Sequence, residues 1–235
     1  SRFPAVRAGE WSKGPSDAAV TFVVYNDFQC LECNDHVLSV LAETHPEDVR
    51  LVYRQFPQPK LYDKAYLAAQ AAEAAGKQDR FWDMHDILFA KQSEWVFLTP
   101  EEFTPWVINE AERFGMDRAR FESDFNDPAT LSKVQKAEAE AKETGIPVLP
   151  LVLINGEIYY GPTDYSAFDQ VVRLTALGKR QFATCPDVTI DPARQYLATI
   201  KTEKGDIVIE LYADKAPLTV NSFIFLVRSG WYDGV

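Results

Sequence analysis

The sequence predicts an α/β fold in which one mixed sheet is interrupted by a long helical segment. Two short runs rich in β-branched and aromatic residues, Ala19–Tyr25 and Val49–Phe56, have the length and composition of buried strands. A long stretch of helical periodicity separates them from a third run, Leu151–Ile154, which leads into Asn155-Gly156, a strong signal for a tight hairpin turn. Strands and helices in this order favour one sheet covered by helices.

The composition limits the classes of protein to consider. With 235 residues, 46% of them hydrophobic and 25% charged, the chain is long enough for one to two domains and can bury a full core. A formal net charge of −11 argues against nucleic acid and anionic membrane surfaces as partners, because both require a basic face. Since no apolar run approaches the roughly 18 residues of a membrane span, we expect no membrane insertion by this chain.

The first third of the chain is expected to begin with an arm and continue with a strand, a helix and a strand. Residues 1–18 are polar and without period, so they are interpreted as an N-terminal arm. The chain begins with Ser1 and shows no signal peptide, which we interpret as a processed or engineered start. After the first strand, Cys33, Val37, Val40 and Leu41 recur at helical spacing and predict one apolar helix face.

The middle of the chain is predicted to be helical, because its apolar residues recur at helical spacing between clear start and stop signals. Thr99-Pro-Glu-Glu102 has the pattern of a capping box with proline in the first turn, and Gly145 is placed to end the last helix. The predicted helices cover residues 65–75, 80–89, 99 to about 115, and 128–144.

The last third contains the rest of the hairpin, a helix, an aperiodic segment, and a second hairpin with its own helix. Residues 157–160 are expected to return from the hairpin turn, and residues 165–177 form an amphipathic helix. Residues 179–196 lack any period and predict a linker. A second hairpin, with strands at 198–202 and 207–212, and a helix from Pro217 to Ser229 that ends at Gly230 follow.

Two of the three cysteines, Cys30 and Cys33, stand directly after the first strand, where the next helix is expected to open. A thiolate at a helix N-terminus meets unpaired N–H groups and the positive end of the helix dipole, which lower its pKa. A second cysteine one turn later can close a disulfide and resolve a mixed disulfide. The pattern therefore predicts thiol–disulfide exchange, for which no bound cofactor is needed.

Two other interpretations of these cysteines remain open. The pair could form an inert stapling disulfide, or it could belong to a zinc site, since His36 continues a C-x2-C-x2-H spacing. Cys185, the third cysteine, lies far away in the predicted linker, so the sequence does not supply a tetrahedral ligand set and we expect no metal. Cys185 itself is interpreted as a free linker thiol, with pairing to another chain or a third redox role as alternatives.

Residues 20 to about 178 resemble the DsbA-like branch of the thioredoxin superfamily. The matching segments occur in the family's order: Val24–Cys33, Tyr53–Pro57, Phe81–Phe89 and Gly145–Gly156. The resemblance implies a thioredoxin fold with an inserted helical subdomain at about 61–144.

The same resemblance assigns roles to residues of this chain. It implies that Cys30 is the exposed nucleophile and Cys33 the buried resolving thiol, and that Leu149-Pro150 carries a cis peptide bond opposite them. Leu149 and Pro150, together with Leu31 and Glu32 between the cysteines, would then contact an extended substrate segment.

This chain departs from the family's usual pattern at the cysteine pair. The family usually has proline after the first cysteine, whereas this chain has Leu31-Glu32. Glu32, together with Asp27 and Asp35, places negative charge near the nucleophile and opposes a low thiolate pKa. The sequence therefore predicts a weaker oxidant than the strongly oxidising members. His85, within the apolar stripe of residues 81–88, is interpreted as a packed helix residue and not a catalytic one.

Residues 197–235 resemble the opening of a cyclophilin-type peptidyl-prolyl isomerase. Ala198–Tyr212, Ala216–Phe223 and Ser229–Gly234 match in order and spacing. Two strands and one helix cannot close that family's eight-stranded barrel, and none of its proline-pocket residues can be assigned here. We therefore expect no isomerase activity from this chain. The apolar faces formed by Ile207, Ile209 and Leu211 and by Val220, Phe223 and Val227 are expected to pack on the preceding domain or on a second chain, which would allow a dimer.

These observations predict a protein disulfide oxidoreductase (19–178) joined by a linker (179–196) to an incomplete cyclophilin fragment (197–235). Its expected partners are cysteine-containing unfolded or folding proteins and a redox partner protein, in an extracytoplasmic location. Two alternatives are a non-catalytic folding helper that binds unfolded chains, and a peptidyl-prolyl isomerase when full length. The direction of exchange, as oxidase, reductase or isomerase, is left open by the sequence.

Overall fold

The computed structural model describes residues 3–33, 35–179 and 181–233 and divides the chain into two compact units, residues 1–176 and 177–235. The remaining positions, which include the start of the predicted arm, one residue of the predicted linker and the last two residues of the cyclophilin-like segment, lie outside the described residues. Each unit is described by itself.

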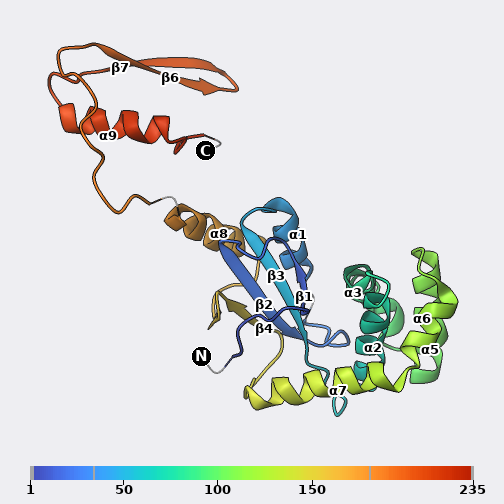
Figure 1. Cartoon of the computed structure of the whole chain (residues 1–235). Coiled ribbons are helices and arrows are strands. Elements are labelled where there is room, and N and C mark those ends of the chain that lie inside the picture. Colours follow the sequence, from blue (N-terminus) through green and yellow to red (C-terminus); the bar gives the residue numbers. More distant parts are fainter. Residues whose placement is uncertain (1–2, 34, 180, 234–235) are drawn as a thin grey trace. The chain divides into compact units, whose positions relative to one another are not determined.

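The first unit is built on one mixed sheet, as the sequence predicts, and the sheet has five strands, one more than expected (Figure 1). Its strands are β1 (Trp11–Lys13), β2 (Val20–Asn26), β3 (Val49–Gln55), β4 (Leu151–Ile154) and β5 (Glu157–Ile158), in the order β1-β3-β2-β4-β5. β2 and β3 run parallel, and the other pairs are antiparallel. β2 and β3 are buried along nearly their whole length, which explains why their sequences are almost continuously apolar.

Helices cover one face of the sheet, where α1 (His36–Thr44) and α8 (Tyr165–Lys179) pack against it. Phe22, Leu51 and Val152 point to this face and meet Leu41 of α1 and Phe168 of α8. In α1 the fully buried positions are Leu38, Ser39, Leu41 and Ala42. Of the predicted stripe, Cys33 and Leu41 are fully buried and Val37 packs half-buried against the same core, while Val40 is only half-buried.

The opposite face is covered by the N-terminal arm and the end of α7 (Pro128–Glu143). Tyr25, Val52 and Leu153 pack there against Phe3 and Ala141. Gly145, at φ +66°, follows α7 as expected for a helix stop, and Asn155 and Gly156, at φ +50° and +88°, form the predicted tight turn between β4 and β5. β5 is shorter than predicted and ends at Ile158.

Between β3 and β4 the chain forms a helical insertion with its own core of aromatic and alanine side chains. The insertion contains α2 (Ala65–Gly76), α3 (Phe81–Ala90), α4 (Gln92–Trp95), α5 (Pro100–Arg113), α6 (Arg118–Phe125) and α7. Thr99 and Glu102 form the predicted capping box at the start of α5. The short helices α4 and α6 were not predicted. Figure 1 shows α2, α3, α5 and α6 gathered beside the sheet, with α7 leading back to it.

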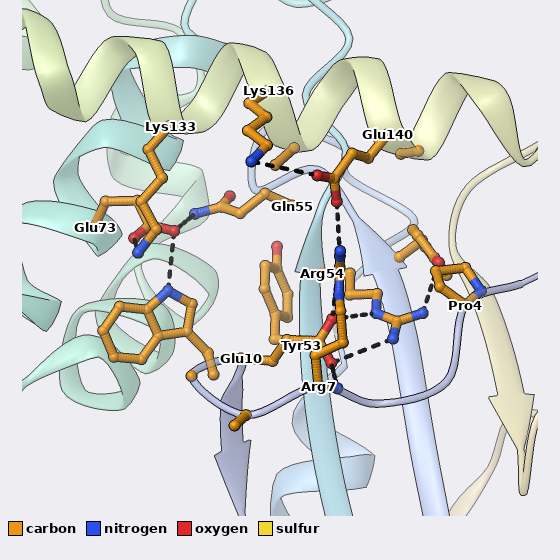
Figure 2. Close-up of a pocket in the computed structure, with 16 residues that line it drawn as sticks. Pro4, Arg7, Glu10, Tyr53, Arg54, Gln55, Glu73, Lys133, Lys136 and Glu140 are labelled. Atoms are coloured by element: carbon orange, nitrogen blue, oxygen red, sulfur yellow. Dashed lines mark hydrogen bonds and ion pairs between the residues drawn. The ribbon is translucent and has the colours of Figure 1, made fainter.

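The N-terminal arm contains a strand that the polar sequence of residues 1–18 did not predict. β1 pairs with β3, and the Trp11 ring stacks on Phe81 at 4.4 Å while its Nε1 donates to Glu73. Figure 2 shows the ion pairs that hold the arm: Arg54 binds Glu10 at 2.9 Å, and Arg7 binds Glu140 at 2.7 Å. The arm is ordered by long-range contacts, which local periodicity cannot reveal.

The second unit contains a two-stranded sheet and one helix within its described residues. The antiparallel strands β6 (Tyr196–Thr202) and β7 (Gly205–Leu211) and helix α9 (Pro217–Arg228) agree with the predicted elements. Its buried apolar core consists of Ile190, Ala213 and Val220. Asn221 of α9 is also buried; it accepts from the Thr189 backbone N–H and donates to the Asp187 carbonyl, so part of the predicted linker is fixed on α9.

Candidate active site

Cys30 and Cys33 form a disulfide in the loop between β2 and α1, with their Cα atoms 5.2 Å apart. Cys33 is fully buried, and Cys30 is 6% exposed. The expectation of a buried second cysteine is confirmed, whereas the expectation that Cys30 is openly accessible was wrong for this oxidised form. Cys30 is still the more exposed of the two. The residues between them project outward, with Leu31 59% exposed and Glu32 also exposed.

The prediction that Cys30 lies in the first turn of a helix was wrong. α1 begins at His36, six residues later, and the cysteine loop consists of successive turns. In this loop the carbonyls of both cysteines accept hydrogen bonds from side chains of other elements. The Cys33 carbonyl accepts from Asn26 Nδ2 at 2.7 Å, and the Cys30 carbonyl accepts from Gln92 Nε2 at 2.9 Å. The disulfide therefore lies ahead of the helix dipole and not on it.

Two glutamines fasten the cysteine loop to the helical insertion. Gln92 of α4 is buried, and its Nε2 donates to both the Phe28 and the Cys30 carbonyls, at 2.8 and 2.9 Å. Gln29, within the loop, accepts from the Lys64 backbone N–H and donates to Asp63 at the start of α2. The insertion thus fixes the backbone that presents the cysteines.

Asp27 is a buried carboxyl group at the start of the cysteine loop. Burial raises its pKa to about 6, although the backbone N–H groups of Gln29 and Gln58, which donate to its two oxygens, act in the opposite direction. The sequence indicated Asp27 only as a nearby acid. Its location three residues before Cys30 gives the site a carboxyl group that titrates close to neutral pH.

The Leu149-Pro150 peptide bond is cis, as predicted. Residue 150 immediately precedes β4, and the pairing of Tyr25 with Leu151 brings it to the end of β2 from which the cysteine loop departs. Leu149 and Pro150 are half-buried, and Val148 before them is 65% exposed. A contact between Pro150 and the two cysteines remains a prediction.

A buried charge cluster lies beside the cysteine loop. Asp35, two residues after Cys33 and immediately before α1, faces His85 Nε2 of α3 at 3.2 Å, while His85 Nδ1 faces Asp86 at 2.8 Å. Burial alone would lower the pKa of His85, but Asp35 and Asp86 outweigh it and raise this pKa to about 9. The interpretation of His85 as a packed helix residue is confirmed, since it is 1% exposed.

Sequence reasoning missed most of the polar residues that support the loop. Asn26, Gln29 and Gln92 carry no local signal, because their partners lie in other elements. His85 could have been noticed as the one ionisable residue in the apolar stripe Phe81–Leu88 that is turned toward the core.

The first unit contains two cavities among its described residues. One, of about 370 Å³, lies between the N-terminal arm, β3 and α7, and its charged side chains pair with one another as Figure 2 shows. The other, of about 300 Å³, lies between the start of α1 and α3 and is lined by Asp35, Ser39 and His85. Within the described ranges no three His, Cys, Asp or Glu side chains are grouped as a metal would require. Among the described residues, Cys185 is an exposed free cysteine.

The chain is similar to known thioredoxin-like proteins over its first unit and to cyclophilins at its end. Residues 8–173 match the family model described as thioredoxin, and residues 197–235 match that of the cyclophilin-type peptidyl-prolyl cis-trans isomerases. Among solved structures, α-DsbA1 of Wolbachia pipientis is similar with a TM-score of 0.62 and 16% identity, covering 75% of this chain and 96% of that one. Oxidised BdbD of Bacillus subtilis is similar with a TM-score of 0.58 and 22% identity, covering 72% and 94%.

Curated relatives are much longer than the matched region. A protein named Na(+)/H(+) antiporter NhaA 3, from Salinispora tropica, is 32% identical over 163 residues, which is 68% of this chain and 24% of that protein. A protein named Na(+)/H(+) antiporter NhaA, from Herminiimonas arsenicoxydans, is 31% identical and covers 72% of this chain and 26% of that protein. The chain thus spans about a quarter of these relatives. No helix in the described part of this chain has the length and apolarity needed to cross a membrane.

Proposed function

Since the chain belongs to the thioredoxin family through residues 8–173, we propose that it is a DsbA-like thiol–disulfide oxidoreductase that acts through Cys30 and Cys33. The observation that supports this most directly is the Cys30–Cys33 disulfide in the loop after β2, at the sheet end where β4 begins behind a cis proline. An inert staple would not need a loop whose carbonyls are bound by side chains of β2 and α4 and whose Gln29 side chain binds the backbone at the start of α2.

The proposed exchange proceeds in two balanced steps. A substrate thiolate attacks Cys30 Sγ, the Cys30–Cys33 bond breaks, and Cys33 leaves as a thiolate that takes up a proton. A second substrate thiolate then attacks the substrate sulfur of the mixed disulfide, and Cys30 leaves as a thiolate. The substrate loses two electrons and gains a disulfide, and the reduced pair returns to the disulfide by the reverse exchange with a disulfide-bearing redox partner protein.

The difference in exposure between the cysteines supports these roles. Cys30 retains 6% of its surface and stands next to the exposed Leu31 and Glu32, whereas Cys33 has none and can be reached only from within the protein. Attack from outside is therefore assigned to Cys30, and resolution to Cys33. The half-buried Leu149 and Pro150 are proposed to pair with an extended substrate segment.

The wider setting belongs to the proposal as well. We assign the substrates to cysteine-containing exported proteins and the location to the extracytoplasmic side, because disulfides form and persist in oxidising compartments. The match of residues 197–235 to cyclophilins supports a fusion with an isomerase-type domain. Ion transport is not included, because the match covers only about a quarter of the proteins that bear that name.

Trapping of a mixed disulfide tests this function. Cys33→Ser should accumulate a mixed disulfide with a disulfide-bearing model substrate. The Cys30 thiolate attacks one substrate sulfur, the other substrate sulfur leaves as a thiol, and no resolving thiol remains to release the adduct. Cys30→Ser should form none. Cys185→Ser is the matched control and should exchange disulfides at the wild-type rate. An adduct that forms through Cys185, or a Cys33→Ser chain that forms none, would refute the proposal.

A non-catalytic folding helper is a second candidate, favoured by the exposed apolar side chains Leu31 and Val148 near the disulfide. Binding of an unfolded protein that survives Cys30→Ala, without any turnover of a disulfide substrate by the wild-type chain, would support the helper over the enzyme.

A further inference from the structure

His85 is held in an environment built for a positive charge. Both ring nitrogens face carboxylate oxygens, Asp35 at 3.2 Å and Asp86 at 2.8 Å. A neutral imidazole has only one N–H, so it would point a lone pair at one of these carboxylates, whereas an imidazolium donates to both.

Aromatic rings complete this environment. The rings of Tyr53, Trp82, Phe89 and Phe28 lie with their centroids 4.8, 5.0, 5.1 and 5.7 Å from the His85 ring. These rings exclude water from the imidazole and leave its charge weakly screened, so the two carboxylates act on it strongly.

This cation is coupled to the cysteine loop by two routes. The first is Asp35, which is 3% exposed, lies two residues after Cys33 and precedes α1. The second is Phe28, whose ring contacts His85 and whose carbonyl shares the Gln92 amide with the Cys30 carbonyl. His85 itself belongs to α3, so the pair joins the helical insertion to the redox loop.

The other charged and titratable groups around the pair come from several elements. Asp86 on α3 also pairs with Lys13 of β1 at 3.5 Å, the Tyr53 hydroxyl on β3 is buried, and Glu43 and His36 of α1 line the adjoining cavity. Within the described residues, Asp35 Oδ1 and Ser39 Oγ are buried without a hydrogen-bond partner, and both residues line this cavity. A negative charge on Asp35 is thus balanced chiefly by His85.

We propose that the buried Asp35–His85 pair is a positioning pair that sets the reduction potential of the Cys30–Cys33 disulfide. Reduction creates a thiolate beside a carboxylate-rich loop. The His85 cation stabilises that thiolate and offsets Asp35, which makes the disulfide more oxidising than the acids alone would allow. The inference rests on the proposed exchange function and adds residues that no cysteine motif contains.

The two members of the pair are expected to shift the potential in opposite directions. His85→Gln removes the cation, so the reduced form becomes less stable, and the equilibrium with the glutathione couple should move roughly tenfold toward the disulfide, equivalent to about 30 mV. Asp35→Asn removes the anion and should raise the potential, and the double variant should return close to the wild-type value. Loss of packing alone would not give shifts of opposite sign.

The test is a redox titration of the wild-type chain and the variants against glutathione at pH 7, with thermal unfolding as a check of folding. His45→Gln is the matched control, because His45 also pairs with an aspartate, Asp169 at 2.7 Å, but on α8. It should leave the potential unchanged. Shifts of the same sign in His85→Gln and Asp35→Asn, or no shift in either, would overturn the proposal while leaving the exchange function intact. A wild-type pair that does not equilibrate with glutathione would overturn both.

Should His85→Gln fail to fold, Asp35→Asn decides alone, because it keeps the shape of the side chain and removes only the charge. A potential that is unchanged or lowered in that variant overturns the proposal, and a raised potential supports it.

Discussion

At the residue scale, the cysteine loop contains or contacts several buried polar side chains. Asp27, Gln92 and His85 come from a loop and two helices, and each side chain is more than nine-tenths buried. Buried polar groups of this kind cost free energy unless they are paired, so their presence around one disulfide indicates a site tuned for a reaction.

Glu32 should make the disulfide less oxidising. It is exposed between the two cysteines, and its negative charge disfavours the Cys30 thiolate, which has no helix N-terminus to compensate because α1 begins only at His36. We predict a potential nearer thioredoxin's roughly −270 mV than DsbA's roughly −120 mV. Glu32→Gln should lower the thiolate pKa by about half a unit, as expected for a solvated charge a few ångströms away, and raise the potential.

The thiolate absorbance of Cys30 as a function of pH checks this prediction. A wild-type thiol that titrates near the roughly 3.5 of DsbA would contradict it.

Asp27 should make stability depend on pH. Its carboxyl titrates near 3.8 in the unfolded chain and at about 6 in the fold, so the protonated form is favoured in the native state. The contribution to the free energy of unfolding is therefore fully present below about pH 4 and is lost as the pH rises through 6, by up to roughly 3 kcal/mol. Urea unfolding between pH 4 and 7 measures this slope.

Asp27→Asn should flatten that slope, whereas Glu122→Gln, at an exposed carboxyl on α6, should not. An Asp27→Asn chain with the wild-type dependence on pH would show that another group is responsible.

At the element scale, the helical insertion supports the redox loop. α4, a helix of four residues, contributes Gln92, and the start of α2 contributes the backbone N–H that binds Gln29. The loop forms turn hydrogen bonds of its own, such as that from the Cys33 N–H to the Cys30 carbonyl at 3.2 Å, and the side chains of Gln92 and Asn26 bind its carbonyls as well. The conformation of the cysteine loop therefore depends on β2, α4 and the start of α2.

Gln92→Ala should loosen the redox loop. It removes the donor of the buried Phe28 carbonyl, and an unpaired buried carbonyl costs about 1–3 kcal/mol, whereas the Cys30 carbonyl still accepts from the Cys33 backbone N–H at 3.2 Å. We expect a loss of stability in this range and faster hydrogen exchange of the amides at 28–33. Gln170→Ala, at an exposed position of α8, is the control and should change neither. Unchanged exchange in the loop of Gln92→Ala would contradict the supporting role of α4.

At the scale of the whole molecule, the two units differ in how much core they possess. The first buries a sheet on both faces and adds a second core inside its insertion, whereas the described residues of the second form a core of three buried apolar side chains. Ile200 and Ile207 face each other across β6 and β7 and remain 46% and 53% exposed.

We predict that this apolar hairpin face is covered in solution, by the thioredoxin-like unit or by a second copy of the chain. An isolated two-stranded sheet is marginal in water, and exposed apolar patches are unusual in monomers. Backbone hydrogen exchange should therefore be slowed across residues 197–229. Rapid exchange throughout that segment, in a chain whose first unit remains protected, would contradict the prediction.

The 235-residue chain should not catalyse prolyl isomerisation. The described part of its second unit contains one hairpin and one helix, which cannot enclose a proline side chain as a closed barrel can. Catalysed isomerisation of a prolyl peptide by this chain would overturn that prediction.

The sequence by itself determined the order of the main strands and helices, the cis bond at Pro150 and the pairing of Cys30 with Cys33. The strands and helices follow from local signals, namely apolar periodicity, capping residues and turn residues, and the cysteine pair from one short motif, whereas the cis bond follows from the resemblance of the segments to a known family. Contacts between residues near one another in sequence leave a pattern that can be read along the chain.

Only the tertiary structure decided where α1 begins, that the polar arm forms β1, that Gln92 binds the Cys30 carbonyl, and that His85 pairs with Asp35. Each of these depends on partners far away along the chain: Gln92 lies 62 residues from Cys30, and His85 lies 50 residues from Asp35. A hydrogen bond or a Coulomb interaction depends on separation in space, and the sequence alone does not encode that separation in any local pattern.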